Sequence, residues 1–190
     1  MRKKVLLVIA LAAFAVGGVF AQEWNNYSPA VAHNRLFVNA GIGIGPTGGW
    51  SMGVPPISAS VDFKLSTPAP ITLGAVAMFT TWKRSDNMYY YTADITYTNT
   101  GFGVRGMYHF NFLETIDTYA GLTLGYVIQG FDVKASSGYT GIAGGYAGSN
   151  FFLFGGNIGA RYFFTDLMGA YVEIGFSGLQ FISAGITLKK

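Results

Sequence analysis

The chain of 190 residues contains no cysteine, so no disulfide framework holds it together and no cysteine carries a lipid anchor. Charge is scarce as well. Asp, Glu, Lys and Arg make up 11% of the residues, against about 25% in ordinary soluble domains. A soluble protein of this size needs more charge on its surface, so the composition argues against a soluble domain.

Long hydrophobic runs are also missing after residue 21, where no apolar stretch approaches the about 18 residues of a membrane-spanning helix. The chain is apolar nevertheless, with 51% hydrophobic residues, 27 glycines and many Tyr and Phe. A backbone that is buried in lipid must satisfy its hydrogen bonds internally, and without helices only a closed β-barrel does so. The composition therefore favours a membrane β-barrel.

The one strongly apolar run lies at the N-terminus. Three basic residues at positions 2–4 precede an apolar stretch over 5–20 and Ala21. This pattern is typical of a secretory signal peptide that is cleaved after Ala21, and the alternative is an uncleaved anchor helix. The same three basic residues account for the whole net charge of +3, so the charge gives no argument for a nucleic-acid partner. We expect a signal peptide over 1–21, a short periplasmic lead-in over 22–32 and one barrel domain over 33–190.

What the sequence has in abundance is alternation. From Leu36 to Ile44 every second residue is apolar, and the residues between them include Asn39, Gly41 and Gly43. A period of two indicates a β-strand, and about ten residues is the length that a tilted strand needs to cross a bilayer. The pattern recurs, so we predict eight antiparallel strands at 35–44, 57–65, 71–82, 99–110, 116–129, 151–164, 168–177 and 179–188.

The expected connections alternate between long and short. Long loops over 45–56, 83–96 and 132–150 follow the first, third and fifth strands, and short turns follow the second, fourth and sixth. Outer-membrane barrels show this asymmetry, with short periplasmic turns and longer outer loops. The link at Gly178 departs from the rule, because it is short where a long loop is expected. An even number of strands places both termini in the periplasm.

Alternation alone does not decide which face is outside, because a soluble lipocalin-type barrel alternates with its apolar face inward. Here the polar face is too poor in charge for a soluble surface, and its many glycines suit a narrow interior. Large aromatic residues also gather at the strand ends, as expected for girdles at the two membrane interfaces. The predicted girdles contain Tyr108, Phe110, Tyr162 and Phe164 at the periplasmic rim, and Phe79, Trp82, Tyr126, Phe152 and Phe176 at the other rim.

Two segments carry a family resemblance. Residues 101–110 read GFGVRGMYHF and residues 155–164 read GGNIGARYFF, followed by a turn and YVEIG at 171–175. Their pattern resembles the OmpA-like and OmpX-like barrel domains of bacterial outer membranes. The resemblance implies an all-β, eight-stranded antiparallel up-and-down transmembrane β-barrel that meets outer-membrane lipid and, during assembly, the barrel-insertion machinery. Family members usually end on an aromatic residue that this machinery reads, whereas this chain ends on Lys190.

Several charged residues fall on the predicted inward face, where burial is costly unless the charges pair. On the predicted strand order, Arg161 lies between Asp117 and Glu173 on the adjacent strands, and Arg105 also neighbours the strand of Asp117. We therefore predict a salt-bridge network centred on these four residues. Its role is either a structural plug or a gated, selective pore, and the narrow interior of eight strands favours the plug. The full set expected in the lumen is Arg35, Asp62, Lys64, Arg105, Asp117, Arg161 and Glu173.

Catalytic and cofactor signatures are weak. Two stretches, 43–48 and 101–106, match G-x-G-x-x-G, but neither opens a helix as a dinucleotide site requires. His33 or His109 could serve acyl transfer beside a serine or an acid, as in barrel enzymes that modify lipid A. Neither has an adjacent serine, and both lie near the expected periplasmic ends. We predict no catalytic residue, no metal, no cofactor and no nucleic-acid partner.

The expected outer loops are the best functional candidates, because binding concentrates in loops on a rigid scaffold. Tyr, Ser and Gly make adaptable contact surfaces. The leading hypothesis is a structural or surface-interaction protein of the outer membrane with an unidentified extracellular ligand, and a lipid-modifying enzyme is the least favoured. The loop residues proposed for interaction are Trp50, Tyr89, Tyr90, Tyr91, Tyr139 and Tyr146.

The alternative hypothesis is transport. A narrow pore, or an OmpW-like conduit for small hydrophobic molecules, would use an apolar mouth at the outer end of the barrel. The residues expected to line such a mouth are Met78, Trp82, Val127 and Leu153. An apolar pocket open to lipid would favour this hypothesis, and a continuous plug of paired charges would oppose it.

Overall fold

The structure, a computed structural model, describes residues 31, 34–46, 48–67, 69–87, 92–113, 116–135, 144–176 and 179–190. The predicted signal peptide and nearly all of the lead-in lie outside the described residues, as does His33. Within the described part, no helix is both long and apolar enough to cross a membrane.

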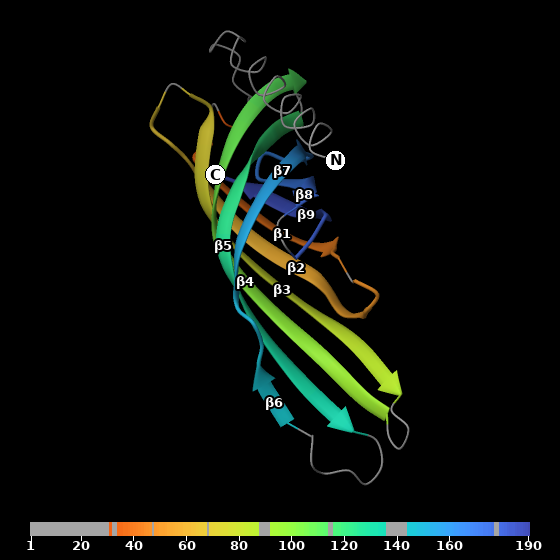
Figure 1. Cartoon of the computed structure of the whole chain (residues 1–190). Coiled ribbons are helices and arrows are strands. Elements are labelled where there is room, and N and C mark those ends of the chain that lie inside the picture. Colours follow the sequence, from red (N-terminus) through yellow and green to blue (C-terminus); the bar gives the residue numbers. More distant parts are fainter. Residues whose placement is uncertain are drawn as a thin grey trace, which may run out of the picture.

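The described strands form one closed antiparallel barrel (Figure 1). Each strand pairs with the next one in the chain, except that β7 pairs with β5 and not with β6, and the last strand, β9, pairs with β1. Both β6 and β7 pair with β5, one beyond the other, so these two strands share one position in the wall. The prediction of an eight-stranded antiparallel barrel is confirmed. The strands are β1 Leu36–Ile44, β2 Ser51–Lys64, β3 Ile71–Asn87, β4 Thr92–Leu113, β5 Ile116–Ala135, β6 Gly144–Ala147, β7 Phe151–Phe163, β8 Met168–Phe176 and β9 Ile182–Lys189.

The barrel wall is apolar outside and polar inside, as the sequence predicts. Ile42, Val104 and Ile158 are exposed on the outer surface. Thr72 and Arg161, from inward positions of β3 and β7, have no exposed surface. Because the interior contains buried polar and charged side chains such as these, it must satisfy their polar groups against one another.

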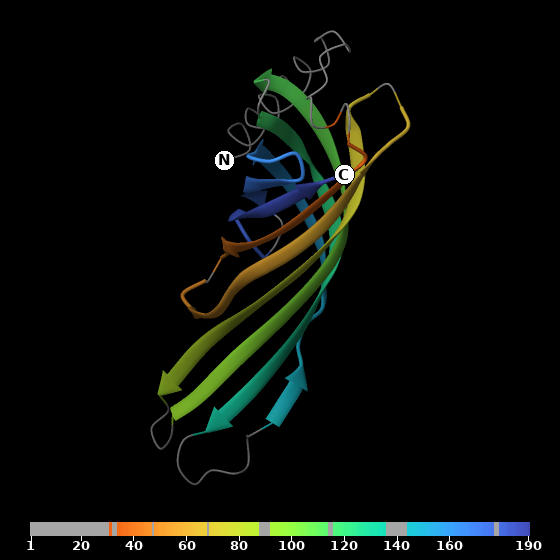
Figure 2. The same ribbon diagram turned by 180° about the vertical axis from the view of Figure 1, so that it is seen from behind.

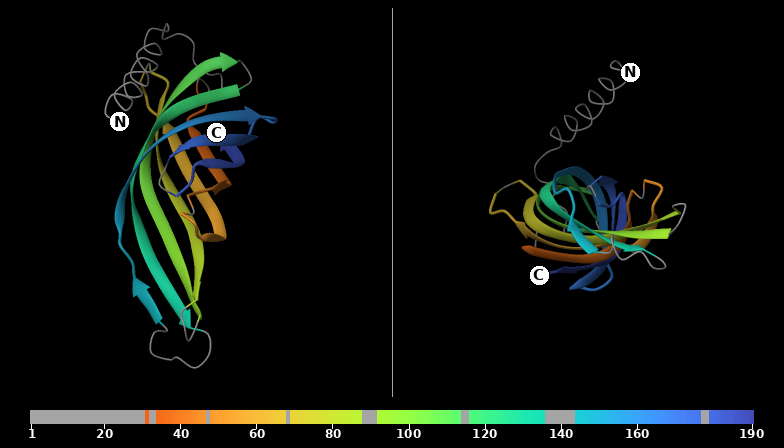
Figure 3. Two further views of the ribbon diagram at one scale, coloured as in Figure 1. Left: turned by 45° about the vertical axis from the view of Figure 1, so that its right-hand side comes forward. Right: turned by 60° about the horizontal axis from the view of Figure 1, so that its bottom comes forward.

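The wall is much taller on one side than on the other (Figures 1 and 2). β3, β4 and β5 have 17, 22 and 20 residues, whereas β1, β8 and β9 have 9, 9 and 8. The long strands extend as a curved sheet past the end of the short ones, and β6 lies along the edge of this extension (Figure 3). We call residues 83–87, 92–97, 130–135 and 144–147 the protruding sheet.

The predicted long loops over 45–56, 83–96 and 132–150 are therefore wrong in extent, because much of each is strand. Their polar composition indicated loops. In the structure β3, β4 and β5 continue through these segments, but the polar residues now lie at the outward positions and the apolar residues at the inward ones. On the protruding sheet the outward positions are Lys83, Asp94 and Asp132, while Tyr97 and Phe131 stack on the inner side. Where a strand passes from apolar surroundings into water, its outward face changes from apolar to charged residues. The sequence of such a segment resembles a loop if the outward face is expected to remain apolar along the whole strand.

Residues 179–181, the described part of the connection between β8 and β9, fold inward over the barrel end. Phe181 donates its N–H to the carbonyl of Ile44 over 2.7 Å, and Gly175 donates to the carbonyl of Phe181 over 2.9 Å. These bonds hold Leu179 inside the barrel, where it has no exposed surface. We call residues 179–181 the inward β8–β9 turn, whereas the predicted link at Gly178 lies outside the described residues. β9 begins at Ile182 rather than at the predicted residue 179.

Candidate functional site

The interior of the barrel is crossed by buried ion pairs, with Arg161 on β7 at their centre. Its Nη1 donates to Asp117 Oδ2 over 3.0 Å, and its Nη2 donates to Asp62 Oδ2 over 2.9 Å. Its Nε donates to Asn39 Oδ1 over 3.2 Å. The guanidinium therefore meets acceptors from three strands, β1, β2 and β5, and every edge of its fork has a partner.

Arg105 on β4 forms the second half of this network. Its two terminal nitrogens hold Glu173 on β8, with Nη2 2.6 Å from Oε1 and Nη1 3.5 Å from Oε2. Tyr119 also donates its hydroxyl to Glu173 Oε1, over 2.8 Å. Arg105 Nε lies 3.0 Å from Asp62 Oδ1, so Asp62 stands between the two arginines and joins the two halves.

The structure brings together the four residues expected at the centre, but in different pairs. Arg161 meets Asp117 on the neighbouring strand, as the strand order suggests. Glu173, however, is held by Arg105 from across the barrel and not by Arg161. Asp62 holds a central position that the strand order does not reveal.

The two remaining charges of the predicted set lie away from this centre. Arg35 precedes β1 and is exposed, and Lys64 ends β2 and is half-buried. Both stand at the end of the barrel where β1 begins beside the C-terminal residue, since Leu36 and Lys190 exchange backbone hydrogen bonds over 2.9 Å. Side chains at a strand end reach water, so alternation alone overestimates how many of them enter the lumen.

Aromatic rings complete the surroundings of Arg161. Its guanidinium carbon lies 4.3 Å from the ring centre of Tyr119 and 4.8 Å from that of Phe37. Both rings are fully buried. Cation–π contacts strengthen when the pair is shielded from water, so these rings stabilise the buried charge. Neither ring is among the residues predicted for the charge network, although each occupies an inward position of its strand.

His109 takes part in an arrangement that resembles a catalytic triad. Its Nδ1 lies 2.9 Å from Asp117 Oδ1, and its Nε2 lies 3.0 Å from Thr72 Oγ1. A hydroxyl, an imidazole and a carboxylate in this order are the parts of a nucleophilic site. Thr72 is fully buried, however, and Phe37 stacks on the imidazole at 6.0 Å. A substrate could not reach the hydroxyl, so in this structure the three groups hold the plug together.

Apolar side chains seal the lumen on the side of the protruding sheet. Leu179 packs there with the four residues expected at the mouth of a conduit and with Val76. The cavities beneath this layer have volumes of about 10 Å³ each, which is room for one water molecule. The apolar mouth of the transport hypothesis is therefore filled by the inward β8–β9 turn. The layer consists of Val76, Met78, Val127, Leu153 and Leu179, with Trp82 packed against it.

Most of the predicted girdle residues lie on the outer surface, at the two ends of the apolar belt. Tyr126 and Phe152 pack edge to face at 5.3 Å, and Phe152 is 87% exposed. Tyr108 and Phe110 pack at 5.7 Å near the opposite end. Trp82 differs, because it points into the barrel and packs on the apolar layer. In β3 the odd-numbered residues, such as Phe79, face outward, so the even-numbered Trp82 faces the lumen.

Of the proposed loop residues, Trp50 contacts other side chains of the described part of the chain. It packs edge to face on Tyr97 at 4.7 Å, and the Arg84 guanidinium carbon lies 5.2 Å from its ring centre. Tyr146 belongs to β6. Tyr89, Tyr90, Tyr91 and Tyr139 lie outside the described residues. Among the described residues, no group of three His, Cys, Asp or Glu side chains is placed to hold a metal ion.

Comparison with known proteins supports the fold. No family model matches the chain, and no curated protein matches it. The solved structure of Neisserial surface protein A (NspA) is similar, with a TM-score of 0.51 and 14% identity over 82% of this chain and 97% of that one. At this identity the likeness shows the fold alone. The chain thus has the fold of the small eight-stranded outer-membrane β-barrels.

Two further solved structures are similar with lower TM-scores. Both are of Ail, the attachment invasion locus protein of Yersinia pestis. One has a TM-score of 0.44 at 10% identity, covering 82% of this chain and 93% of that one. The other, in complex with the heparin analogue sucrose octasulfate, has a TM-score of 0.40 at 11% identity, covering 82% and 94%.

Proposed function

We propose that this chain is an outer-membrane protein of the cell surface, with a closed barrel as its anchor and the protruding sheet as its interaction surface. The observation that carries the proposal is the reversal of polarity along β3, β4 and β5. Apolar residues face outward in the barrel, and charged residues face outward beyond it. Lipid around the barrel and water around the sheet explain both halves of the pattern.

The plugged lumen supports an anchor and not a channel. Ion pairs fill the middle of the barrel and an apolar layer seals one end. We therefore assign a binding function, and not catalysis or conduction, to this protein, and the protruding sheet is the part that would bind the partner. Its six charges balance, with Lys83, Arg84 and Lys134 against Asp86, Asp94 and Asp132. A balanced surface does not attract polyanions or polycations at long range, so its partner is recognised by short-range contacts.

The edge formed by β6 offers such contacts. Gly148 donates its N–H to the carbonyl of Gln129 over 2.7 Å, and hydrogen-bonded pairs alternate along an antiparallel ladder. Gly144 and Tyr146 therefore bond to β5, and the N–H and C=O groups of Gly145 and Ala147 point away from it. β6 is the last strand at this edge of the described sheet (Figure 1).

β6 is a short edge strand of four residues, and it lacks the side chains that commonly prevent strand addition. Natural sheets guard their edges with charges or proline, and β6 has neither. The opposite edge carries Arg84, which pairs with Asp86 at 2.7 Å. Only an extended polypeptide offers donors and acceptors at the spacing of a strand. We infer that β6 binds an extended segment of a partner protein.

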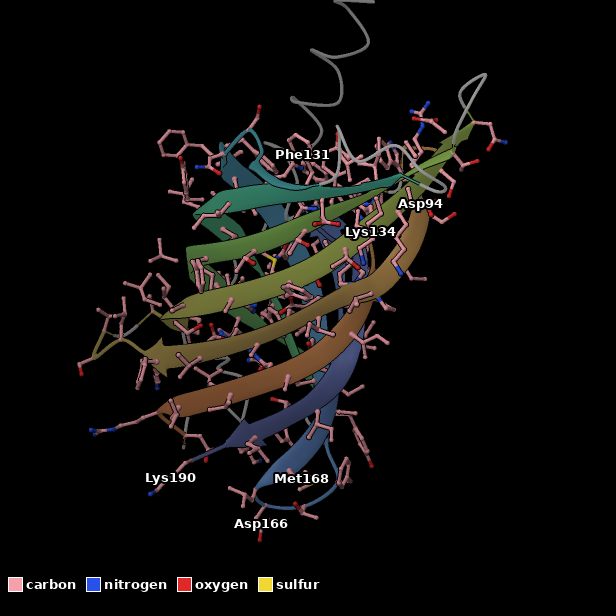
Figure 4. All side chains as sticks on the ribbon, turned by 90° about the horizontal axis from the view of Figure 1, so that it is seen from below. Asp94, Phe131, Lys134, Asp166, Met168 and Lys190 are labelled. Atoms are coloured by element: carbon pink, nitrogen blue, oxygen red, sulfur yellow. The ribbon has the colours of Figure 1, made fainter. Side chains whose placement is uncertain are left out.

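Labelling of introduced cysteines tests whether the barrel lies in the outer membrane and whether its protruding sheet faces the outside of the cell. The chain has no cysteine of its own, so only the introduced residue reacts. Lys134 and Asp166 are exposed and lie far apart, in the protruding sheet and in the β7–β8 turn (Figure 4). A membrane-impermeant maleimide should label Lys134→Cys on intact cells and Asp166→Cys only after the outer membrane is permeabilised. The reverse pattern, or no labelling of Lys134→Cys on intact cells, would contradict the proposal.

Selection from a library of random linear peptides against the barrel in nanodiscs tests the edge. Ala147→Pro removes an outward donor without removing a bond to β5, and proline is tolerated at such edge positions. Selected peptides should bind this variant about tenfold more weakly, which corresponds to about 1.4 kcal/mol. Ser149→Pro, just past β6, is the matched control and should bind normally. Equal loss in both variants would reject the β6 edge as the binding site.

A further inference from the structure

Three aromatic side chains lie in contact on the inner side of the protruding sheet. Tyr97 on β4 stacks on Phe131 on β5 at 5.7 Å, and Trp50, which precedes β2, packs edge to face on Tyr97 at 4.7 Å. All three residues are half-buried, so part of their surface is open to solvent. We call Trp50, Tyr97 and Phe131 the aromatic row. It belongs neither to the charged plug nor to the outward belt of the barrel.

The local structure holds Trp50 in place over the sheet. Gly48 and Gly49, just before it, have φ angles of 57° and 88°, in the left-handed region that glycine enters without steric cost. On the sheet, the Arg84 guanidinium carbon lies 5.2 Å from the ring centre of Trp50, and Arg84 Nε lies 2.7 Å from Asp86 Oδ1. A ring that is held in this way loses little conformational freedom when it binds a ligand.

The polar groups beside the aromatic row are hydrogen-bond donors in excess. Trp82 Nε1 and Asn99 Nδ2 are buried and have no hydrogen-bond partner. Trp82 pairs with Tyr97, and Asn99 lies two residues from Tyr97 on the same face of β4. Trp50 Nε1 and the Tyr97 hydroxyl also make no hydrogen bond with the described part of the chain. The three nitrogens can only donate, so a ligand that suits this site must supply acceptors.

We propose that the aromatic row binds a proline-rich segment of a partner protein in the polyproline II conformation. This inference rests on the proposal that the protruding sheet is an interaction surface, but it concerns a different part of the sheet from the β6 edge. A polyproline II helix has no internal hydrogen bonds, so its carbonyl groups are free to accept, and proline has no N–H that needs an acceptor. Proline-rich segments bind aromatic grooves for this reason and because their conformation is already formed.

The spacing of the rings also suits this helix. A polyproline II helix has three residues per turn and rises about 3.1 Å per residue, so residues i and i+3 lie on one side about 9.3 Å apart. The centre-to-centre distances along the aromatic row are 4.7 Å and 5.7 Å, so the row is about as long as one turn of the helix. Two prolines that are one turn apart can therefore contact the rings at its two ends.

Two other occupants suit the aromatic row less well. A β-strand binds by pairing with the backbone of a sheet edge, whereas the row lies on a face of the sheet, where β4 and β5 already pair with each other. A sugar offers hydroxyl groups, and each hydroxyl donates as well as accepts. The three donor nitrogens accept none of those protons. The excess of donors therefore favours a proline-rich peptide.

Fluorescence anisotropy of a dye-labelled decaproline peptide tests the proposal, with the refolded barrel in nanodiscs. The wild type should bind the peptide saturably. Tyr97→Phe keeps the ring and removes one donor, so it should bind about fivefold more weakly, as expected for one hydrogen bond. Tyr126→Phe makes the same change at an exposed outward position of β5 and should bind as the wild type does. Trp50→Ala removes a ring together with its N–H and should bind at least about tenfold more weakly.

The heat-dependent gel mobility of folded barrels identifies the variants that can be compared. A lack of saturable binding by the wild type would overturn the proposal, and so would equal binding by Tyr97→Phe and Tyr126→Phe. Displacement of the probe by a Gly-Ser peptide of the same length would show that proline is not recognised. Displacement by maltohexaose would identify a sugar site instead, and either result would overturn the proposal.

The variant Ala147→Pro separates this proposal from the one for the β6 edge. It should bind decaproline as the wild type does, because the aromatic row is unchanged. Weaker binding by Ala147→Pro with normal binding by Tyr97→Phe would place the peptide at the edge and overturn the aromatic row alone. Normal decaproline binding by a barrel that selects no peptide at its edge would overturn the edge and support the row.

Discussion

Arg161 donates a hydrogen bond to Asp62 over 2.9 Å, although the two residues are 99 positions apart in the chain. They come from β7 and β2, which are not neighbours in the wall, so the bond crosses the lumen. Both side chains are fully buried. A bridge of this kind holds opposite sides of the barrel at a fixed distance.

Removing the carboxylate of Asp62 should destabilise the barrel strongly. Asp62→Ala leaves Arg161 and Arg105 facing each other without the acid between them. Breaking a buried ion pair from one side costs about 3–5 kcal/mol. The free energy of unfolding in urea, measured for the refolded barrel in liposomes, should fall by this amount. Asp166→Ala, in an exposed turn, should change it by less than about 0.5 kcal/mol, and equal effects would contradict a role for the plug.

The pair of Arg105 and Glu173 should be strongly coupled. Arg105 grips both carboxylate oxygens from across the barrel, at 2.6 Å and 3.5 Å. A double-mutant cycle with Arg105→Met and Glu173→Gln should give a coupling free energy of about 1–3 kcal/mol. Additive single effects, within about 0.5 kcal/mol, would show that the two side chains do not meet in the folded barrel.

Glycine at position 159 should be required for the position of Tyr119. A Cβ there would lie 2.5 Å from Tyr119 Cζ, and Tyr119 both covers Arg161 and donates to Glu173. Gly159→Ala should therefore lower the free energy of unfolding by about 1–3 kcal/mol, as overpacking does.

Gly156→Ala on the same strand is the control for that experiment. Its Cβ would have no neighbour closer than 3.8 Å, because this position faces outward. We expect a change within about 0.5 kcal/mol. If both substitutions had the same effect, backbone freedom and not the space beside Tyr119 would explain the result.

Much of the wall could be predicted from the sequence, because a strand shows its two faces in its own residues. The alternation from Leu36 to Ile44 gives β1 and its facing without any other part of the chain. Contacts between neighbouring strands, such as Arg161 with Asp117, follow from strand order as well. Contacts across the lumen do not, because they depend on the relative stagger of strands that never pair.

The protruding sheet and the inward turn were missed for different reasons. Lys83 and Asp132 continue the alternation with charged residues at the outward positions. A period of two indicates a strand, but it does not show where the outward face of that strand passes from lipid into water. Leu179 is one apolar residue in a short link, and nothing local indicates that it fills the barrel. His109 was identified as a candidate group, but its partner Thr72 is 37 residues away on β3.

Single-channel recording in planar bilayers tests the closed barrel most directly. The refolded chain, prepared without the predicted signal peptide, should show no reproducible conductance steps, because ion pairs cross its lumen and an apolar layer around Leu179 seals one end. The double variant Arg161→Ala/Leu179→Ala, checked for folding by its gel mobility, is the positive control. It should show frequent channel openings, and these would demonstrate that the recording detects an open lumen. Conductance steps of constant size in the wild type would contradict the account and identify the protein as a small pore.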